Sequence, residues 1–369
     1  MRILVVGGGF SGMSAAIVLA ESGHSVELVE IDPGWRSYGA GISLHGATVR
    51  VMEHLRVLEE FRANGAMSNG VEMRGPEDQV LVSLPTPSIQ PGALGNGGIM
   101  RPELARILSQ RLRSTPAHIR LGVTFDKIID RPDAVHVTFS DGTSGDYDLL
   151  IGADGLYSAT RAVLFPDAPA PRYIGQAVWR CVLARPAHLP TVAMWMGPKL
   201  KVGINHVSDS QSYLFLTEDQ PTRDFVAPEM LVEKLRALLL RFSSPTIRTL
   251  AEQLSEENQI VYRPLEQLLM PQPWYRGRVV LIGDAVHATT PHMAAGAMIG
   301  MEDGIVLAEE LSRAPLPQAL AAFQARRWER CRLVVENSGR LAEIEQGHGT
   351  PDEHKMLMGR TLGALAVPA

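Results

Sequence analysis

The first thirty residues contain one strand–helix–strand unit, and this unit restricts the fold more than any other stretch of the chain. The sequence predicts an apolar strand at residues 2–6, an alanine-rich helix at 13–21 and a second strand at 25–30. Between the first strand and the helix it reads Gly-Gly-Gly-Phe-Ser-Gly, which matches G-x-G-x-x-G. A strand–helix–strand unit belongs in a parallel sheet covered by helices, so we expect an α/β protein.

The glycines and the acid that ends the second strand indicate a dinucleotide site. Gly7 permits a tight turn, Gly9 lets a pyrophosphate approach the backbone, and Gly12 lets the helix pack on the strand. Glu30 occupies the position at which a carboxylate accepts hydrogen bonds from ribose hydroxyls. An acid there disfavours a ribose phosphate, so FAD or NAD fits this unit and NADP does not.

Composition excludes several classes of protein. The 369 residues are 45% hydrophobic with a formal net charge of −5, which allows one large or two ordinary domains and argues against nucleic acid as a partner. Cys181 and Cys331 match no metal or redox spacing, so we expect buried thiols in a reducing compartment. The sequence has no signal-peptide pattern and no apolar run long enough for an integral membrane segment, which predicts a cytoplasmic protein.

A second acid follows a strand in the last third of the chain. Val279–Ile282 is predicted to be a buried strand, Asp284 comes just after it, and a helix is expected from Gly296. Asp284 would lie where open α/β sheets bind ligands, beside a helix N-terminus. An ordinary turn with a capping aspartate is the alternative that this stretch alone leaves open.

The other segments predict both helices and an antiparallel sheet. Arg101 opens a helix whose second residue is Pro102, and its charge opposes the helix dipole, which favours an anionic ligand there. Further helices are expected at 47–61, from 158, at 228–242, 246–254 and 318–341, a loop at 85–98 and a weakly patterned tail from 347. Strands are expected at 71–74, 80–84, 123–129, 135–140, 147–151, 176–183, 192–196, 201–206, 212–216 and 259–262.

Three motifs now stand in order: GGGFSG with Glu30, then IGADGLYSATR at 151–161, then LIGDAVHATTP at 281–291. Together they resemble the class A flavoprotein monooxygenases, the para-hydroxybenzoate hydroxylase-like family of FAD-dependent aromatic hydroxylases, over nearly the whole chain. The resemblance implies a Rossmann-like FAD-binding domain with an inserted α+β substrate domain built on an antiparallel sheet. The FAD-binding domain would comprise residues 1–72, 98–171 and 272–340, the substrate domain 73–97 and 172–271, and a C-terminal tail 341–369.

The resemblance also implies roles for single residues. It places the glycines of the first motif at the FAD pyrophosphate and Glu30 at the adenosine ribose. The remaining positions that it assigns to the cofactor are Arg101 near the phosphates and ribityl chain, Asp154 and Gly155 near both FAD and NAD(P)H, Asp284 at the ribityl chain, and Pro291 beside the flavin ring.

The third motif departs from the family pattern after its proline. The family usually continues Pro-x-Gly-Gly-Gln-Gly-x-Asn, whereas this chain has Met293 and Met298 in a stretch without the paired glycines. The helix start survives, so backbone N–H groups of Gly296, Ala297 and Met298 are expected to face the pyrimidine end of the flavin. The two methionines suggest an apolar wall on the substrate side.

Substrate contacts are less constrained. His45, His206 and Tyr213 are candidates for holding or deprotonating a ring substituent, and Trp195 for a pocket wall, although a place in the core or on the sheet surface is more usual for such residues. Arg36 either reaches the adenosine or a phosphate, or is a solvated loop charge. No metal is expected, because neither His287 nor His292 has a carboxylate or cysteine at a metal-site spacing.

The resemblance implies a hydroxylase. FAD reduced by NADH or NADPH, a transient co-substrate, would react with dioxygen to a C4a-hydroperoxide and transfer oxygen to a small, electron-rich aromatic or heteroaromatic substrate. The alternatives are an FAD-dependent dehydrogenase or reductase on the same fold, and a flavin- or nucleotide-binding protein without turnover. The sequence is compatible with a monomer or a homodimer, and it assigns no arginine to the substrate pocket.

Overall fold

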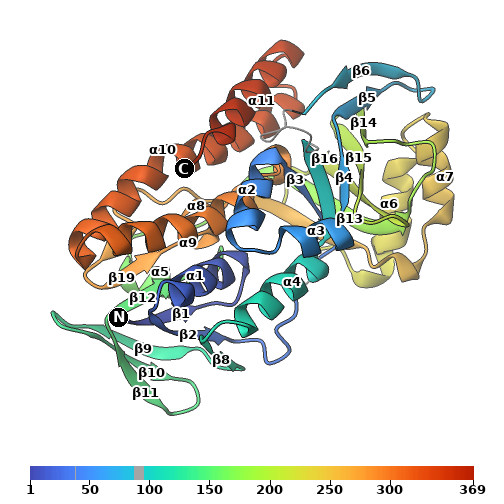
Figure 1. Ribbon diagram of the computed structural model, residues 1–369. Coiled ribbons are helices and arrows are strands. Elements are labelled where there is room, and N and C mark those ends of the chain that lie inside the picture. The colour runs from blue at the N-terminus through green and yellow to red at the C-terminus, as the bar shows by residue number, and fades with distance from the viewer. Residues whose placement is uncertain (38, 87–94) are drawn as a thin grey trace.

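The computed structural model describes residues 1–37, 39–86 and 95–369. Its first sheet has six strands, in the order β18 (Tyr275–Arg276), β19 (Val279–Leu281), β12 (Leu149–Gly152), β1 (Arg2–Val6), β2 (Ser25–Glu30) and β8 (His118–Leu121) (Figure 1). All neighbours run parallel except β18, which is antiparallel to β19. The central strands are buried on both faces, which explains their continuous apolar sequences.

Different layers cover the two faces of this sheet. One face packs in a single core with α1 (Phe10–Glu21), α4 (Arg101–Arg113) and α9 (Gly296–Arg313). The other face packs against a three-stranded antiparallel sheet of β9 (Phe125–Asp130), β10 (Val135–Phe139) and β11 (Ser144–Tyr147). The long α10 (Leu316–Glu345) lies on α9, and α11 (Pro351–Ala366) lies on α10.

A second, seven-stranded sheet lies beside the first sheet and its helices (Figure 1). Its strand order is β17 (Val261–Gln267), β13 (Arg172–Ala184), β16 (Gln211–Asp219), β15 (Leu200–His206), β14 (Val192–Gly197), β5 (Val71–Arg74) and β6 (Val80–Leu84). Only β14 and β5 are parallel neighbours. One face is covered by α6 (Leu231–Leu239) and α7 (Pro245–Gln253), which enclose Trp179 and Trp195.

The opposite face of the seven-stranded sheet turns toward the first sheet and its helices. Between them lies a small sheet of β3 (Gly41–His45), β7 (Asn96–Met100) and β4 (Ala66–Ser68), which contacts β13 and β15. The remaining helices are α2 (Gly46–His54), α3 (Leu58–Asn64), α5 (Ala159–Leu164) and α8 (Asp284–His287), with 3-10 turns at 228–230, 256–258 and 291–293. None of the helices in the described ranges is long and apolar enough to cross a membrane.

The predicted fold class is confirmed, while the division into domains stays a prediction. Residues 73–84 do join the sheet formed by residues 172–267, as that division requires, but β5 begins at Val71, inside the range given to the FAD-binding domain. The expected strand 147–151 corresponds to β12, whereas Tyr147 ends β11, which belongs to another sheet. The parallel edge strand β8 has no counterpart in the sequence-based prediction.

Three predicted segments are corrected by the structure. The helix expected at 47–61 is two helices, because Arg56 adopts a left-handed φ of 59° that ends the first. The loop expected at 85–98 ends early, since Asn96 begins β7; residues 87–94 lie outside the described part. The weakly patterned tail contains α11, capped by the Thr350 side chain, which accepts a hydrogen bond from the Glu353 N–H.

Candidate active site

In the glycine loop between β1 and α1, two glycines leave no room for a side chain and a third borders empty space. Gly7 has φ of +105°, and a Cβ added to it would lie 2.5 Å from the carbonyl oxygen of Ala153. A Cβ added to Gly12 would lie 2.0 Å from the carbonyl oxygen of Gly7. A Cβ added to Gly9 would meet nothing within 4 Å. Gly7 and Gly12 are therefore required by packing, whereas Gly9 borders free space at the N-terminus of α1, which suits a phosphate.

Glu30 lies at the end of β2 and holds the glycine loop. Its Oε2 accepts a 2.7 Å hydrogen bond from the N–H of Gly8, and its Oε1 accepts one of 2.8 Å from the N–H of Asp32. The Trp35 indole donates to the Gly8 carbonyl at 2.8 Å. The carboxylate is half-buried, so it combines a structural contact with access to a ligand beside the loop.

Arg36 binds a carboxylate of its own loop. Its Nε and Nη2 each lie 3.0 Å from an oxygen of Asp32, and these hydrogen bonds hold the pKa of Asp32 below its usual range. The Arg36 side chain is 62% exposed. Its expected role at the adenosine stays a prediction.

The second motif caps a helix and braces the third motif. Both carboxylate oxygens of Asp154 accept hydrogen bonds at the start of α5: Oδ1 from the Ser158 hydroxyl, and Oδ2 from the Thr160 N–H and hydroxyl. Gly155 follows with φ of +80°. The Arg161 side chain is buried, and its guanidinium donates to the Ala285 carbonyl at 2.7 Å. The contact of Arg161 with the third motif was not predicted from the sequence.

Asp284 and Arg101 face a common space. Both side chains are reachable by solvent although protein atoms surround them, as expected for groups in the wall of a cleft. Burial raises the pKa of Asp284, while the charges of His287 and Arg101 oppose that rise. The Arg101 guanidinium lies 4.9 Å from the centre of the Phe10 ring at the start of α1. The start of α4 thus lies against the start of α1, and the charge of Asp284 at the start of α8 acts on Arg101.

A buried ionic cluster fixes the third motif to α9 and α10. His287 Nε2 lies 2.6 Å from Asp303 Oδ2, which also accepts a 2.8 Å hydrogen bond from the Gly283 N–H. Arg327 donates to Asp303 Oδ1 at 2.7 Å and to Glu302 Oε2 at 3.0 Å. Burial alone would lower the pKa of His287, but the Asp303 carboxylate outweighs it and raises that pKa well above its usual range.

Ligand atoms of His287, Asp303 and Cys331 lie within 4.8 Å of one another, a spacing that could hold a metal ion. The Arg327 guanidinium already lies there, with Nη2 3.4 Å from the Cys331 sulfur. Its positive charge opposes a bound cation, so the cluster is accounted for by ion pairing.

The segment after Pro291 leads into α9. Pro291–Met293 form a 3-10 turn, and Ala294 adopts a left-handed φ of 50° before the helix begins at Gly296. The Ile299 N–H donates to the Ala295 carbonyl, so the N–H groups of Gly296, Ala297 and Met298 precede the first helical hydrogen bond of α9 and have no acceptor within the helix.

Residues proposed as pocket walls lie elsewhere. Met293 and Met298 are fully buried in the core around the first sheet, because the helix phase turns them inward. Trp195 packs under α6 and α7 and donates to Asp78 Oδ1 at 3.0 Å. The expected apolar wall of methionines and Trp195 is therefore wrong.

The three candidates for a catalytic side chain have different surroundings. His206 is buried with Nδ1 2.7 Å from the Ser212 hydroxyl and Nε2 2.7 Å from the Leu189 carbonyl, which leaves neither nitrogen for a substrate. His45 is buried, and Glu302 is the strongest charge acting on it, so it lies toward α9. Its Nε2 has no hydrogen-bond partner in the described ranges, and burial lowers its pKa to about 4.

Tyr213 is better placed than the two histidines to contact a substrate. It lies on β16 on the face turned toward the small sheet, and its hydroxyl is 3.1 Å from the Ser43 hydroxyl. A Cβ on Gly41 would lie 2.4 Å from its ring, and the Phe215 ring is 5.6 Å away.

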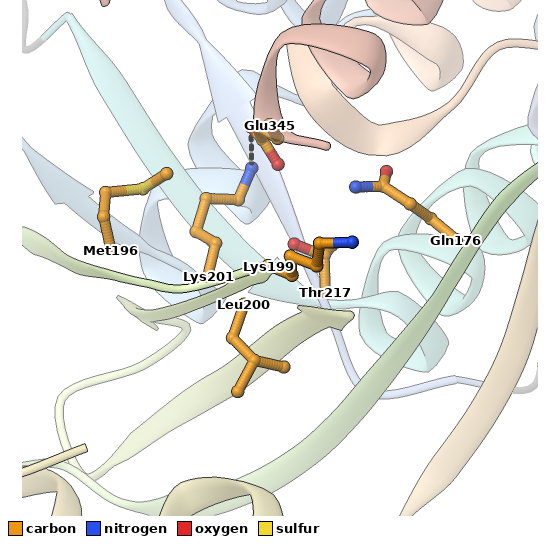
Figure 2. Close-up of a pocket in the computed structure, with 7 residues that line it drawn as sticks. All are labelled: Gln176, Met196, Lys199, Leu200, Lys201, Thr217 and Glu345. Atoms are coloured by element: carbon orange, nitrogen blue, oxygen red, sulfur yellow. Dashed lines mark hydrogen bonds and ion pairs between the residues drawn. The ribbon is translucent and has the colours of Figure 1, made fainter. Parts of the chain in front are cut away.

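A second ionic contact joins the seven-stranded sheet to α10. Lys201 on β15 pairs with Glu345 at 2.5 Å, at a crevice of about 10 Å³ that is too small for an organic ligand (Figure 2). The other oxygen of Glu345 lies 3.4 Å from Nε2 of His292, the residue after Pro291. The contact therefore links the sheet, α10 and the turn at Pro291.

Comparison with known proteins decides the family. A model of the FAD binding domain matches residues 1–338. The chain is 32% identical over 353 residues to aurachin C monooxygenase/isomerase of Stigmatella aurantiaca, covering 94% of this chain and 90% of that protein. It belongs to the class A FAD-dependent aromatic monooxygenases.

Further relatives agree with this assignment. The monooxygenase is 30% identical over 356 residues to 2-heptyl-3-hydroxy-4(1H)-quinolone synthase of Pseudomonas aeruginosa, covering 94% of this chain and 90% of that protein. The structure of Klebsiella pneumoniae HpxO complexed with FAD and uric acid matches with a TM-score of 0.83 at 25% identity, covering 99% of this chain and 96% of that one. The predicted family and the FAD cofactor are confirmed, and the family resemblance favours a monooxygenase over a dehydrogenase.

Proposed function

We propose that this enzyme inserts one oxygen atom of dioxygen into a small aromatic or heteroaromatic ring, with NADH or NADPH as reductant. The quinolone and the uric acid named with two of its relatives are nitrogen heteroaromatics, which supports this substrate class. In the balanced reaction, the ring C–H becomes C–OH, the second oxygen atom leaves as water, and NAD(P)H supplies two electrons.

The observation that carries the proposal is the cleft between Asp284 and Arg101. Gly9 borders open space at the start of α1, and Arg101 and Asp284 are opposite, exposed charges that act on each other without forming an ion pair among the described residues. The free N–H groups at the start of α9 lie in the same chain segment as Asp284. This combination fits a long, anionic and hydroxylated molecule such as FAD.

The residues would share the cofactor as follows. The N-terminus of α1 beside Gly9 would bind the diphosphate and Glu30 the adenosine ribose. Asp284 would accept hydrogen bonds from the ribityl chain, with Arg101 near the phosphates, and the first N–H groups of α9 would donate to the pyrimidine end. When bound, FAD supplies the redox chemistry: it accepts a hydride and activates dioxygen.

Tyr213 is the proposed contact for the substrate. Burial raises its pKa, so its hydroxyl stays protonated near neutral pH and can donate a hydrogen bond to a ring substituent. It would orient the ring and would not act as a base. Pro291 is proposed to lie beside the flavin, whereas the contacts of His206 and His45 give no support to their expected roles.

The test is a panel of phenols, hydroxypyridines, aminobenzoates and quinolones with the FAD-loaded enzyme. NADH or NADPH consumption is measured together with incorporation of labelled dioxygen. Labelled hydroxylated product supports the proposal, whereas oxidation or reduction without oxygen gain under anaerobic conditions contradicts it. A cytoplasmic location and the oligomeric state, monomer or homodimer, stay predictions.

A further inference from the structure

Arg180 occupies the face of the seven-stranded sheet that is turned away from α6 and α7. Its neighbours on β13, Trp179 and Cys181, are buried in the core beneath those helices, so the strand alternation turns Arg180 to the opposite face. Its register partner on β16 is Phe215, and Tyr213 lies two residues before Phe215 on that strand. Arg180 is thus next to the aromatic pair on the substrate-facing side.

The guanidinium of Arg180 has no compensating partner in the described ranges. It is half-buried, yet it makes no hydrogen bond, ion pair or ring contact there. Other buried arginines of this chain are satisfied: Arg74 is paired with Glu72, and Arg327 with Asp303 and Glu302. A half-buried cation without an acceptor is costly, which favours an anion from outside the chain.

The charges around Arg180 strengthen this argument. Burial lowers the pKa of Arg180, and the nearby cations Arg101 and Arg263 lower it as well, while only the Tyr213 phenol acts in the opposite direction. A guanidinium stays charged under these conditions, so the space that it faces has a positive potential. In the proposed function the FAD diphosphate is bound by the N-terminus of α1 with Arg101 beside it, so Arg180 is left for a second anion.

We propose that Arg180 binds a carboxylate on the aromatic substrate and thereby selects acids over neutral rings. The inference rests on the hydroxylase function proposed above. Two parallel N–H···O hydrogen bonds from the guanidinium would fix the carboxylate, and the ring would lie against Tyr213 and Phe215. Arg180 then determines specificity by orienting the ring, and it takes no part in the oxygen transfer.

The test measures binding to the oxidised, FAD-loaded enzyme through the change in flavin absorbance. The probes are 2-aminobenzoate and 4-hydroxybenzoate, each beside its amide, which has nearly the same shape without the charge. For the native enzyme we expect each acid to bind about 10-fold or more tightly than its amide. In Arg180→Gln the Kd of the acids should rise about 10- to 100-fold, with the amides changed by less than about 3-fold.

Two variants control this experiment. Arg172→Gln removes the same charge from the exposed end of the same strand and should leave all four Kd values unchanged. Arg180→Lys keeps the charge but loses the paired hydrogen bonds, so it should fall between the native enzyme and Arg180→Gln. If Arg180→Gln does not fold, the Kd values of Arg180→Lys for the acids and amides still test the proposal.

Several outcomes would overturn the proposal. Equal affinity of the native enzyme for acid and amide, including no measurable binding of either, shows that the site does not select a carboxylate. A loss of FAD affinity in Arg180→Gln with unchanged acid preference would assign Arg180 to the cofactor. Labelled oxygen incorporated into neutral substrates alone would retain the hydroxylase function while rejecting the role of Arg180.

Discussion

His287 and Asp303 share a 2.6 Å hydrogen bond between Nε2 and Oδ2 in a site where both side chains are fully buried. The same carboxylate oxygen accepts the N–H of Gly283, the residue that precedes Asp284. Asp284 therefore owes its position to an acid nineteen residues further along, on α9. The ion pair holds the turn that carries Asp284, the proposed ligand of the ribityl chain.

Replacing Asp303 should loosen that turn. In Asp303→Asn the charges of His287 and Arg327 lose their common partner in a buried site, which should lower the free energy of unfolding by about 3–5 kcal/mol. FAD retention should fall as well. Urea unfolding and FAD titration measure the two effects.

Glu309→Gln is the matched control for Asp303→Asn. Glu309 and Arg326 form a partly exposed pair, and Arg326 keeps Glu310 as a second partner, so the loss of Glu309 should cost less than about 1 kcal/mol. Equal losses of unfolding free energy in the two variants would show that burial does not increase the contribution of the Asp303 ion pair to stability.

The contact between Lys201 and Glu345 predicts a pH-dependent stability. Burial would raise the pKa of Glu345, but the charge of Lys201 outweighs burial and holds that pKa well below its usual range. A carboxyl group whose pKa is lower in the folded than in the unfolded protein stabilises the folded state at every pH above its pKa in the unfolded chain, about 4.3. This stabilisation is lost as the pH falls through the pKa in the folded protein. Glu345→Gln should therefore be less stable than the native protein by about 3–5 kcal/mol at pH 7.

The difference caused by Glu345→Gln should shrink as the pH falls below about 4. Urea unfolding at pH 7, 5 and 3.5 measures it. Glu343→Gln, at an exposed ion pair with Arg340, should show a small difference. A stability loss of Glu345→Gln that is constant across the pH range contradicts the assignment.

Asp284 can be tested through the cofactor alone. Asp284→Ala removes a proposed acceptor for a ribityl hydroxyl, worth about 1.5–3 kcal/mol for a charged group, so the Kd for FAD should rise about 10- to 100-fold. The apoprotein should keep its stability, because the Asp284 carboxylate accepts no hydrogen bond from the described residues. Fluorescence titration of the apoprotein with FAD measures the affinity, and an unchanged Kd would remove Asp284 from the site.

The parts of the site that the sequence predicted are local ones. The glycine loop and Asp284 depend on backbone geometry within a few residues of a strand end, so spacing alone indicates their positions. The pairings of Arg161 with Ala285 and of Asp303 with Arg327 join segments that are far apart in the chain. Such contacts depend on sheet order and helix packing, which hydrophobic periodicity does not encode.

The substrate side was harder to predict for the same reason. Whether Arg180 or Trp179 faces the cleft depends on which face of β13 receives α6 and α7, and both faces of that strand carry apolar residues. Met293 and Met298 are apolar residues beside a pocket motif, but the phase of the turn and helix carries them into the core. Candidate residues could therefore be named from the sequence, but their orientation required the structure.

The last prediction separates the two functions of glycine in the loop. Gly9 has a φ of −72°, which any residue adopts, and an added Cβ would meet no protein atom within 4 Å. Gly9→Ala should therefore fold with native stability but bind FAD at least about 10-fold more weakly, because the methyl group would fill space next to the diphosphate.

In Gly12→Ala the added Cβ would lie 2.0 Å from the Gly7 carbonyl oxygen, so the free energy of unfolding itself should fall, by about 1–3 kcal/mol or more. Thermal unfolding of both apoproteins and titration with FAD distinguish the two effects. Native FAD affinity in a well-folded Gly9→Ala would show that the diphosphate does not lie against this loop.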